Sequence, residues 1–369
     1  TMKILYIEPY YAGSHQQWIE AYKYHSRHQI DILSLPGKKW KWRMHGGAVS
    51  LANKFIENDK KYDLIVVSDF LNLPVFKTLC FDKLGDTKIC MYFHENQITY
   101  PWSPKDQDIK LNRDLHYAYI NYTSSLVSDY NFFNSNYHLT SYIVGLKKYL
   151  KKMPDFNNLD SINVISDKSS VLPLGCDLGK INSHKNENDV PIILWNHRWE
   201  YDKNPDLFFK ALYKIKQKNI DFKLVVVGEH FKEFPKIFNE AKVKLKKNLL
   251  QFGFCKSFNE YQNWLNKSDI LPVTSIQDFF GVSITEAIYA GLLPVLPNRL
   301  SYPELINIKN NKSIFYNTDK EFIDLLMYNI IHYKDLRKYT NKYKDLIYRF
   351  DWSNIKNVYD DKFEEISNN

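Results

Sequence analysis

Short apolar segments alternate with helix-length segments along most of the chain, and this alternation starts twice. The first series of strand-like segments is Lys3–Ile7, Gln29–Leu33, Leu64–Val67, Ile89–Phe93, Asn131–Phe133 and Val171–Pro173. After a polar, linker-like stretch from Gly179 to Asp189, the second series is Ile192–Trp195, Lys223–Val227, Leu249–Phe252, Ile270–Thr274 and Leu293–Leu296. Continuous apolar strands separated by helices are typical of parallel sheets that are covered on both faces. The pattern therefore predicts an α/β protein with two doubly wound, Rossmann-like domains that face a cleft.

The length of 369 residues fits two domains of ordinary size. We expect an N-terminal domain over residues 1–178 and a C-terminal domain over residues 190–340. Residues 341–369 are expected to form a helical segment that can cross back to the first domain.

Charge and composition narrow the functional classes. The net charge of +8 suits a polyanionic partner, either nucleic acid or an anionic membrane face, and does not choose between them. The four cysteines lie far apart, which argues against a disulfide framework and fits a reducing compartment. No segment approaches the roughly 20 apolar residues that span a bilayer. We therefore expect a cytoplasmic protein without stable membrane insertion, and the sequence indicates no protein partner.

Several common cofactor and metal motifs are missing from the sequence. The turn after the first strand is not a G-x-G-x-x-G fingerprint, and neither a P-loop nor a G-x-S-x-G elbow occurs. Asp106-Gln107-Asp108 fits a D-x-D metal motif, but it follows a Pro-Trp-Ser-Pro turn rather than a strand end, and His138 stands alone. We therefore expect no metal and no cofactor.

The segment Asp278–Ala287 carries the clearest candidate site. Asp278 and Glu286 stand eight residues apart, on either side of a turn that contains Gly281 and leads into an apolar helix. Open N–H groups at a helix start suit a phosphate, and flanking carboxylates suit the hydroxyls of a sugar and a ribose. The pattern indicates a nucleotide-sugar clamp. An ordinary acidic helix start would look the same, and this segment alone does not decide between the two.

Three further strand ends carry polar residues, and parallel sheets bind ligands at that edge. Gly13, in the turn after the first strand, allows close approach of a ligand to the backbone, although a plain strand-to-helix turn is the alternative. The run His94–Gln97 directly follows a buried strand. Arg198 and Lys203 follow the first strand of the second series and can converge on a diphosphate. The alternative interpretation is that Arg198 and Lys203 form surface ion pairs with Glu200 or Asp202.

The segment Lys38–Arg43 is the best argument for an RNA partner. Its cations are interleaved with Trp40 and Trp42, and cations can pair with phosphates while an aromatic face stacks on an unpaired base. The alternative is that the tryptophans pack in the core while the lysines reach outward to solvent.

The two-domain layout, Gly13 in the first turn, the pair Arg198 and Lys203, and the pair Asp278 and Glu286 resemble retaining glycosyltransferases of the GT-B fold, family 4. That family's signature is two glutamates with seven residues between them, and Asp278 departs from it by one methylene. A more specific resemblance is to the tRNA-queuosine mannosyltransferase family, and it covers nearly the whole chain. The segments that carry it are Glu8–His15, Lys38–Arg43, Phe93–Gln97, Phe132–Ser135, His197–Glu200, Phe279–Val282 and Tyr302–Glu304.

The resemblance implies transfer of mannose from GDP-mannose, with retention and without a metal, to the cyclopentene diol of queuosine at the tRNA wobble position. The favoured mechanism is front-face attack, in which the leaving phosphate takes the acceptor proton. The implied catalytic residues are Asp278, His94, Arg198 and Lys203. The implied donor-binding residues are Gly13, Ser14, Arg198, Lys203, Phe280, Gly281, Val282, Ser283 and Glu286. The implied acceptor-binding residues are His15, Lys38, Lys39, Trp40, Lys41, Trp42, Arg43, Glu95, Asn96 and Gln97.

Two alternatives stay open. One is a retaining hexosyltransferase of the same fold that acts on a polysaccharide or glycolipid, with its basic face against an anionic membrane. The other is a non-catalytic tRNA-binding protein, which Arg198, Lys203 and Glu286 count against.

Overall fold

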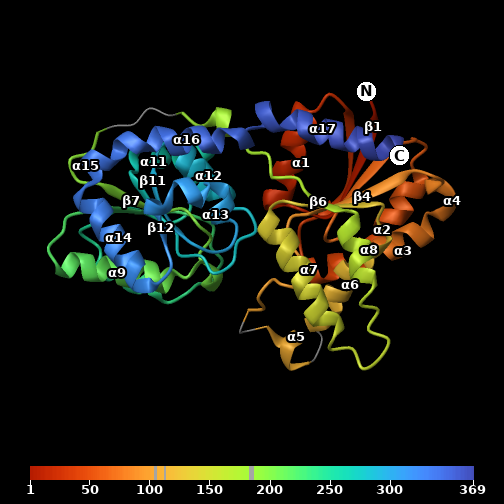
Figure 1. Ribbon diagram of the computed structural model, residues 1–369, viewed down its shortest axis with the longest axis horizontal. Coiled ribbons are helices and arrows are strands. Elements are labelled where there is room, and N and C mark those ends of the chain that lie inside the picture. Colours follow the sequence, from red (N-terminus) through yellow and green to blue (C-terminus); the bar gives the residue numbers. More distant parts are fainter. Residues whose placement is uncertain (104–105, 112–113, 183–186) are drawn as a thin grey trace. The chain divides into compact units, whose positions relative to one another are not determined.

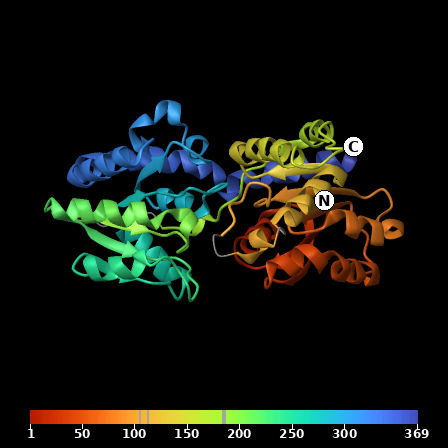
Figure 2. The same cartoon turned by 90° about the horizontal axis from the view of Figure 1, so that it is seen from below.

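The computed structural model describes residues 1–103, 106–111, 114–182 and 187–369 (Figure 1). The chain forms two compact units. The first unit contains residues 1–175 and 352–369, and the second unit contains residues 176–351. The first unit is therefore discontinuous in sequence. In each unit a parallel sheet lies between helices (Figure 2).

The sheet of the first unit has six parallel strands in the order β2-β1-β3-β4-β5-β6. Its strands are β1 (Lys3–Tyr11), β2 (Gln29–Pro36), β3 (Leu64–Ser68), β4 (Lys88–Phe93), β5 (Tyr130–Phe133) and β6 (Ser169–Val171). The strand order reverses between β1 and β3, so the segments that follow these strands flank the topological switch point. The central strands are buried because helices cover both faces.

The helices of the first unit divide between the two faces of its sheet. They are α1 (Gly13–His25), α2 (Trp40–Glu57), α3 (Leu73–Leu79), α4 (Phe81–Leu84), α5 (Gln107–Lys110), α6 (Asp114–Val127), α7 (Asn136–Leu150), α8 (Ser161–Asp167) and α17 (Trp352–Asn368). Side chains of α2, α3, α6 and α7 pack with β1, β3 and β4 in one apolar core. Helices α1 and α17 lie side by side and share an aromatic cluster on the other face (Figure 1).

Helix α17 is anchored to the first unit by buried polar contacts as well as by aromatic packing. The Tyr22 hydroxyl donates to Asp360 Oδ1 at 2.7 Å, and the Trp18 indole N–H donates to the Tyr359 hydroxyl at 3.2 Å. The Tyr359 hydroxyl in turn donates to the carbonyl of Pro173 at 2.6 Å. The last helix of the chain is thus an integral part of the unit that contains the first strand.

The sheet of the second unit also has six parallel strands, in the order β12-β11-β10-β7-β8-β9. Its strands are β7 (Ile192–Trp195), β8 (Lys223–Val226), β9 (Leu249–Phe252), β10 (Ile270–Pro272), β11 (Leu293–Pro297) and β12 (Phe315–Tyr316). Here the order reverses between β7 and β10. Trp195, Phe208, Phe209 and Phe238 lie in the core that these strands share with the helices.

Each strand of the second unit is followed by one or more helical segments. The α-helices are α9 (Pro205–Gln217), α10 (Ile237–Lys244), α11 (Phe258–Lys267), α12 (Val282–Tyr289), α13 (Tyr302–Leu305), α14 (Asp319–Ile331), α15 (Tyr333–Leu336) and α16 (Thr340–Ile347). Short 3-10 helices are η1 (Leu178–Lys180), η2 (Tyr201–Lys203), η3 (Ile308–Asn310), η4 (Lys312–Ile314), η5 (Arg337–Tyr339) and η6 (Tyr348–Phe350).

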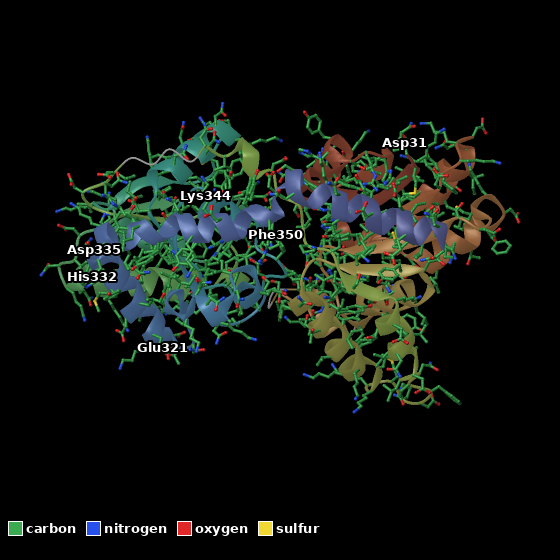
Figure 3. The ribbon with its side chains drawn as sticks, turned by 45° about the horizontal axis from the view of Figure 1, so that its top comes forward. Asp31, Glu321, His332, Asp335, Lys344 and Phe350 are labelled. Carbon is green, nitrogen blue, oxygen red and sulfur yellow. The ribbon has the colours of Figure 1, made fainter. Side chains whose placement is uncertain are left out.

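The second unit begins and ends at neighbouring positions. The Cys176 N–H donates to the carbonyl of Phe350 at 2.8 Å, and Cys176 and Asp351 form a parallel bridge. Figure 3 labels Phe350 at the end of the helical run that precedes α17, with Lys344 one helix earlier on α16.

The predicted fold class, two doubly wound α/β domains, is confirmed. Strand β7 has the predicted bounds, whereas β6 runs over Ser169–Val171 rather than Val171–Pro173. Pro173 has no N–H to contribute to a ladder, so the strand ends before it. The two-residue strand β12 was not among the predicted strands. Within the predicted linker over 179–189, residues 183–186 lie outside the described residues.

Candidate functional site

The candidate site of the second unit lies at the switch point of its sheet. The segment after β7 contains Asn196–Lys203, and the segment after β10 contains Val273–Gly281. These two strands are neighbours, so the segments that follow them meet at the carboxyl edge. Doubly wound sheets bind ligands at this position.

Helix α12 begins with an unusual backbone conformation at Gly281. This residue has φ 99° and ψ 60°, a left-handed conformation that strains any residue with a Cβ. A Cβ there would also lie 3.3 Å from Ile284 Cδ1 and 3.5 Å from Asp278 Oδ2. No side chain caps this helix start within the described part of the chain. The first turn of α12, with Val282 and Ser283, therefore presents a positive helix end beside Asp278.

The carboxylate of Asp278 is held in place by neighbours from three segments. The hydroxyl of Tyr302, the first residue of α13, donates to Asp278 Oδ2 at 2.9 Å. The N–H of Phe280 donates to Oδ1 at 3.4 Å, and the Lys203 ammonium lies 3.8 Å from Oδ2. Tyr302 is fully buried, so its hydroxyl fixes the orientation of an acid that is mostly shielded from solvent.

The two predicted cations lie in different surroundings. Lys203 is 8% exposed, and its ammonium donates to the Gln277 carbonyl at 2.8 Å and lies 3.4 Å from Asp202. It therefore ties the segment after β7 to the segment after β10. Arg198 is exposed, and its guanidinium lies 3.4 Å from Glu200. The ion pairs considered as the alternative from sequence are thus present, while Lys203 also reaches Asp278.

Glu286, on α12, is half-buried and takes part in a chain of hydrogen bonds. The Tyr261 hydroxyl donates to Glu286 Oε2 at 2.9 Å and accepts from the Asn196 amide at 3.0 Å. The same amide donates to the Ser283 carbonyl at 2.9 Å. Burial raises the pKa of Glu286 to about 7, against the lowering effect of the Tyr261 hydrogen bond and with a further increase from Asp177. This carboxyl group is therefore poised to titrate near neutral pH.

The first unit has its own polar cluster at the carboxyl ends of β1, β3 and β4. Glu8 is fully buried and accepts hydrogen bonds from His15 Nδ1 at 2.9 Å, from the Ser68 hydroxyl at 2.8 Å and from the Tyr6 hydroxyl at 3.0 Å. Burial alone would lower the pKa of His15. The charge and hydrogen bond of Glu8, with the charges of Asp69 and Glu95, instead raise that pKa to about 9. His15 is therefore a cation at neutral pH.

His94 packs against His15, but its imidazole is neutral whereas that of His15 is charged. Their ring centroids are 4.2 Å apart, and the backbone N–H of His94 donates to Asp69 Oδ1 at 2.9 Å. Burial lowers the pKa of His94 well below its usual value, and the neighbouring His15 and His138 add to this. The pair therefore combines a charged and a neutral imidazole at one strand edge.

The other predicted residues at these strand ends take different positions. Gly13 (φ 54°) and Ser14 are exposed in the first turn of α1. Asn96 is fully buried, and its Oδ1 accepts from the N–H groups of Ile98 and Thr99, so it closes the turn after β4. Glu95 and Gln97 on either side of it are partly exposed, and the backbone N–H of Gln97 donates to Asn121 Oδ1.

The predicted RNA segment Lys38–Arg43 forms the approach to α2 and its first turn. Lys38 and Lys39 are exposed, and Trp42 is 59% exposed with its ring against Gly46. Trp40 is partly buried and packs against Phe70 and Tyr117, as expected if this tryptophan belongs to the core.

The two later cations of the segment are paired. The Lys41 ammonium lies 2.8 Å from Asp106 and 2.5 Å from Asp108, and Arg43 donates to the Pro36 carbonyl at 2.9 Å. The side chains of this segment that remain exposed to solvent are therefore Lys38, Lys39 and Trp42.

Four residues orient the predicted side chains but were not among the predicted site residues: Glu8 in the first unit, and Asn196, Tyr261 and Tyr302 in the second. Glu8 and Asn196 lie in or beside segments that carry predicted site residues. Their hydrogen-bond partners, however, are distant in sequence. Tyr302 belongs to a segment used for the resemblance, whereas Tyr261, on α11, had no local signal at all. Only the sheet order brings Tyr261 to Glu286.

Among the residues that the structure describes, no group of three or more His, Cys, Asp or Glu side chains could hold a metal ion. No helix in the described ranges combines the length and the apolar character needed to cross a bilayer.

Two Rossmann-like units, each built on a six-stranded parallel sheet, define the GT-B fold of glycosyltransferases. Solved structures agree on the fold. Sucrose-phosphate synthase from Thermosynechococcus elongatus superposes with a TM-score of 0.74 at 12% identity, covering 99% of both chains. HepE from Anabaena, solved in complex with UDP, superposes with a TM-score of 0.67 at 15% identity, covering 99% of this chain and 100% of HepE.

Sequence comparisons identify the family. Residues 3–176 match the family model for the N-terminal part of tRNA-queuosine alpha-mannosyltransferase, and residues 180–345 match glycosyl transferases group 1. The tRNA-queuosine alpha-mannosyltransferase of Drosophila melanogaster is 35% identical over 327 residues, covering 85% of this chain and 83% of that protein. The chain belongs to the tRNA-queuosine alpha-mannosyltransferase family. The resemblance seen in the sequence is confirmed, while the individual residue roles stay predictions.

Proposed function

We propose that this protein transfers mannose from GDP-mannose to the cyclopentene diol of queuosine at the wobble position of tRNA, with retention of configuration. The observation that carries the proposal is the 35% identity to a tRNA-queuosine alpha-mannosyltransferase over 85% of the chain. The clamp of Asp278, Lys203 and Glu286 in the second unit supports it. Because the proposed acceptor is tRNA, we also propose a cytoplasmic location.

In this proposal the second unit binds the donor. Glu286, oriented by Tyr261, accepts hydrogen bonds from the ribose hydroxyls, and Asp278, oriented by Tyr302, accepts them from mannose hydroxyls. Lys203 and Arg198 neutralise the diphosphate together with the backbone N–H groups at the start of α12. These interactions strengthen as negative charge builds on the departing GDP, and they therefore lower the barrier to transfer.

Retention follows from the chemistry of the proposed donor and product. GDP-mannose carries an α-linked mannose, and the name of the Drosophila relative specifies an α-mannoside product. In the proposed front-face reaction, the acceptor hydroxyl forms its bond to C1 on the side from which GDP leaves. The bond from C1 to the β-phosphate oxygen breaks, and that phosphate takes the proton of the hydroxyl. His94, which stays neutral, provides a hydrogen-bonding group for the sugar without adding charge.

The acceptor-binding residues are proposed in the first unit. Lys38 and Lys39 pair with RNA phosphates, and the exposed indole of Trp42 stacks on an unpaired base. This arrangement fits the anticodon loop, because sequence-specific RNA recognition mostly uses bases that are not in a helix.

The test is a transfer assay with GDP-mannose and bulk tRNA, isolated from cells with and without queuosine. Nucleoside mass spectrometry should find one added hexose only on queuosine, and only in the queuosine-containing tRNA. Transfer should continue in EDTA, because the proposed mechanism uses no metal ion. Asp278→Asn should abolish the product, whereas Asp31→Asn, a change in the first unit outside the candidate site, should not.

Three other results would replace the proposal. Hexose transfer from UDP-sugars but not from GDP-mannose would change the donor. Nucleotide-sugar hydrolysis without any modified tRNA would move the acceptor to a glycan or lipid. Binding of tRNA without binding of any nucleotide sugar would point to a non-catalytic protein.

A further inference from the structure

His197 is a buried residue of the second unit, and one of its ring nitrogens makes no hydrogen bond to the part of the chain that the structure describes. It lies two residues beyond the end of β7, at the carboxyl edge of the sheet, and only 3% of it is exposed. Its Nε2 has no hydrogen-bond partner among the described residues. Buried polar atoms of this kind are rare in folded proteins, because each one loses its hydrogen bonds to water without replacement.

The position of His197 is fixed by its backbone and by its ring. The Trp195 indole N–H donates to the His197 carbonyl at 3.0 Å, and the two rings meet edge to face with centroids 5.0 Å apart. Gly228, after β8, has φ 117°, and a Cβ there would lie 2.1 Å from the same carbonyl oxygen. A side chain at position 228 would therefore displace His197, and glycine allows the close approach.

The surroundings determine which form of the imidazole is present. Burial and the nearby Lys203 lower the pKa of His197 to about 3, and Asp278 opposes this only in part, so the ring is neutral at physiological pH. The Ser283 hydroxyl lies 3.4 Å from Nδ1. When this hydroxyl donates, Nδ1 accepts and the ring proton is on Nε2. The unpartnered nitrogen is then a hydrogen-bond donor.

We infer that His197 is a donor-binding residue whose Nε2–H donates a hydrogen bond to a diphosphate oxygen of the bound nucleotide sugar. This inference rests on the proposed function. Ser283, in the first turn of α12, contacts the ring, and the charges of Lys203 and Asp278 are close enough to shift its pKa. These are the groups proposed to hold the diphosphate and the sugar. A phosphate oxygen is the strongest acceptor that such a ligand offers to a neutral N–H group.

A neutral imidazole has an advantage at this position. It stabilises the charge that develops on the leaving phosphate, yet it keeps its proton, so the phosphate stays free to accept the proton of the attacking hydroxyl. The hydrogen bond becomes stronger as that charge grows. Removal of the Nε2–H should therefore lower kcat as well as the affinity for GDP.

The test measures GDP binding by calorimetry for the wild type and two substitutions. His197→Phe keeps the ring and its contact with Trp195 but removes both nitrogens, and GDP affinity should fall roughly ten- to hundredfold. His197→Gln keeps an N–H donor at a similar reach, and it should restore part of this loss in affinity and in kcat. His332→Phe, a change at an exposed histidine after α14 (Figure 3), is the matched control and should bind GDP normally.

The possible outcomes separate this inference from the proposed function. Unchanged GDP affinity in a folded His197→Phe variant would overturn the inference while leaving the proposed function intact. A loss for GDP-mannose but not for GDP would assign the nitrogen to a sugar hydroxyl and overturn the diphosphate assignment. Equal losses for His197→Phe and His197→Gln, at unchanged thermal stability, would show that the N–H group is not what matters. A wild type that binds UDP and not GDP would refute the donor assignment, and the same comparison with UDP would still test His197.

Discussion

The raised pKa of Glu286 should make the second unit less stable at high pH. Burial raises that pKa from the ordinary value of 4.5 to about 7. Since the folded state holds this proton more tightly than the unfolded state, stability is greatest below pH 4.5 and falls as the pH rises through 7. One pKa unit corresponds to about 1.4 kcal/mol, so ionisation of Glu286 should cost about 2–3 kcal/mol of unfolding free energy between pH 5 and pH 8.

The substitution Glu286→Gln tests this reasoning, because glutamine accepts the same Tyr261 hydrogen bond but never ionises. The difference in melting temperature between variant and wild type should change in favour of the variant by roughly 5–10 °C between pH 5 and pH 8. Scanning calorimetry of the transition of the second unit would measure it. At the same time the variant should bind GDP more weakly, because the ribose hydroxyls lose a charged acceptor.

Glu321 serves as a control, because its contribution to stability should change with pH in the opposite direction. Glu321, on α14, is exposed, and hydrogen bonds from the Asn317 backbone and side chain, opposed in part by desolvation, lower its pKa. Its contribution to stability is therefore present above the unfolded pKa and is lost as the pH falls, so Glu321→Gln should be more destabilising at pH 8 than at low pH. A melting difference for Glu286→Gln that stays constant from pH 5 to pH 8 would refute the burial argument.

Two further predictions concern ligand binding. Tyr261→Phe removes a hydrogen bond that lowers the pKa of Glu286, so the rise of GDP affinity with pH should move to higher pH in a pH titration. An unshifted curve would contradict this. Trp42→Ala should weaken tRNA binding by about 5- to 100-fold in a filter-binding assay, since one base loses a stacking partner. Its melting temperature and GDP affinity should match the wild type, because the side chain is 59% exposed, and a large loss of stability would instead make Trp42 a core residue.

The strand pattern was predictable because the sheets are parallel and buried on both faces. Such strands are nearly continuous apolar runs, and Ile192–Trp195 is a strand with the predicted bounds. Strand β12, Phe315–Tyr316, is too short to leave any periodic signal. The extension of β1 to Tyr11 was also missed, because polar Glu8 and Pro9 look like the end of a strand.

Residues of the candidate sites could be proposed from the sequence only where a local pattern marks them. His94 directly follows an apolar run, Lys203 shares a segment with Arg198, and Asp278 has a fixed spacing to Glu286. The partners that orient them are set by the order of strands in the sheet. Tyr261 reaches Glu286 from another helix, and no local pattern encodes that contact. The charge states of the histidines could not be predicted from the sequence either. His15 is charged and His94 is neutral because the buried Glu8 pairs with His15.

The position of α17 has a consequence for how the chain folds during synthesis. Trp18 and Tyr22 are covered by residues that leave the ribosome more than 300 positions later. At about 5–20 residues per second, the growing chain must wait tens of seconds with this aromatic face open. The second unit is continuous in sequence and can fold in that interval. The unit that is begun first is thus completed last, and its exposed face is where a chaperone would be needed.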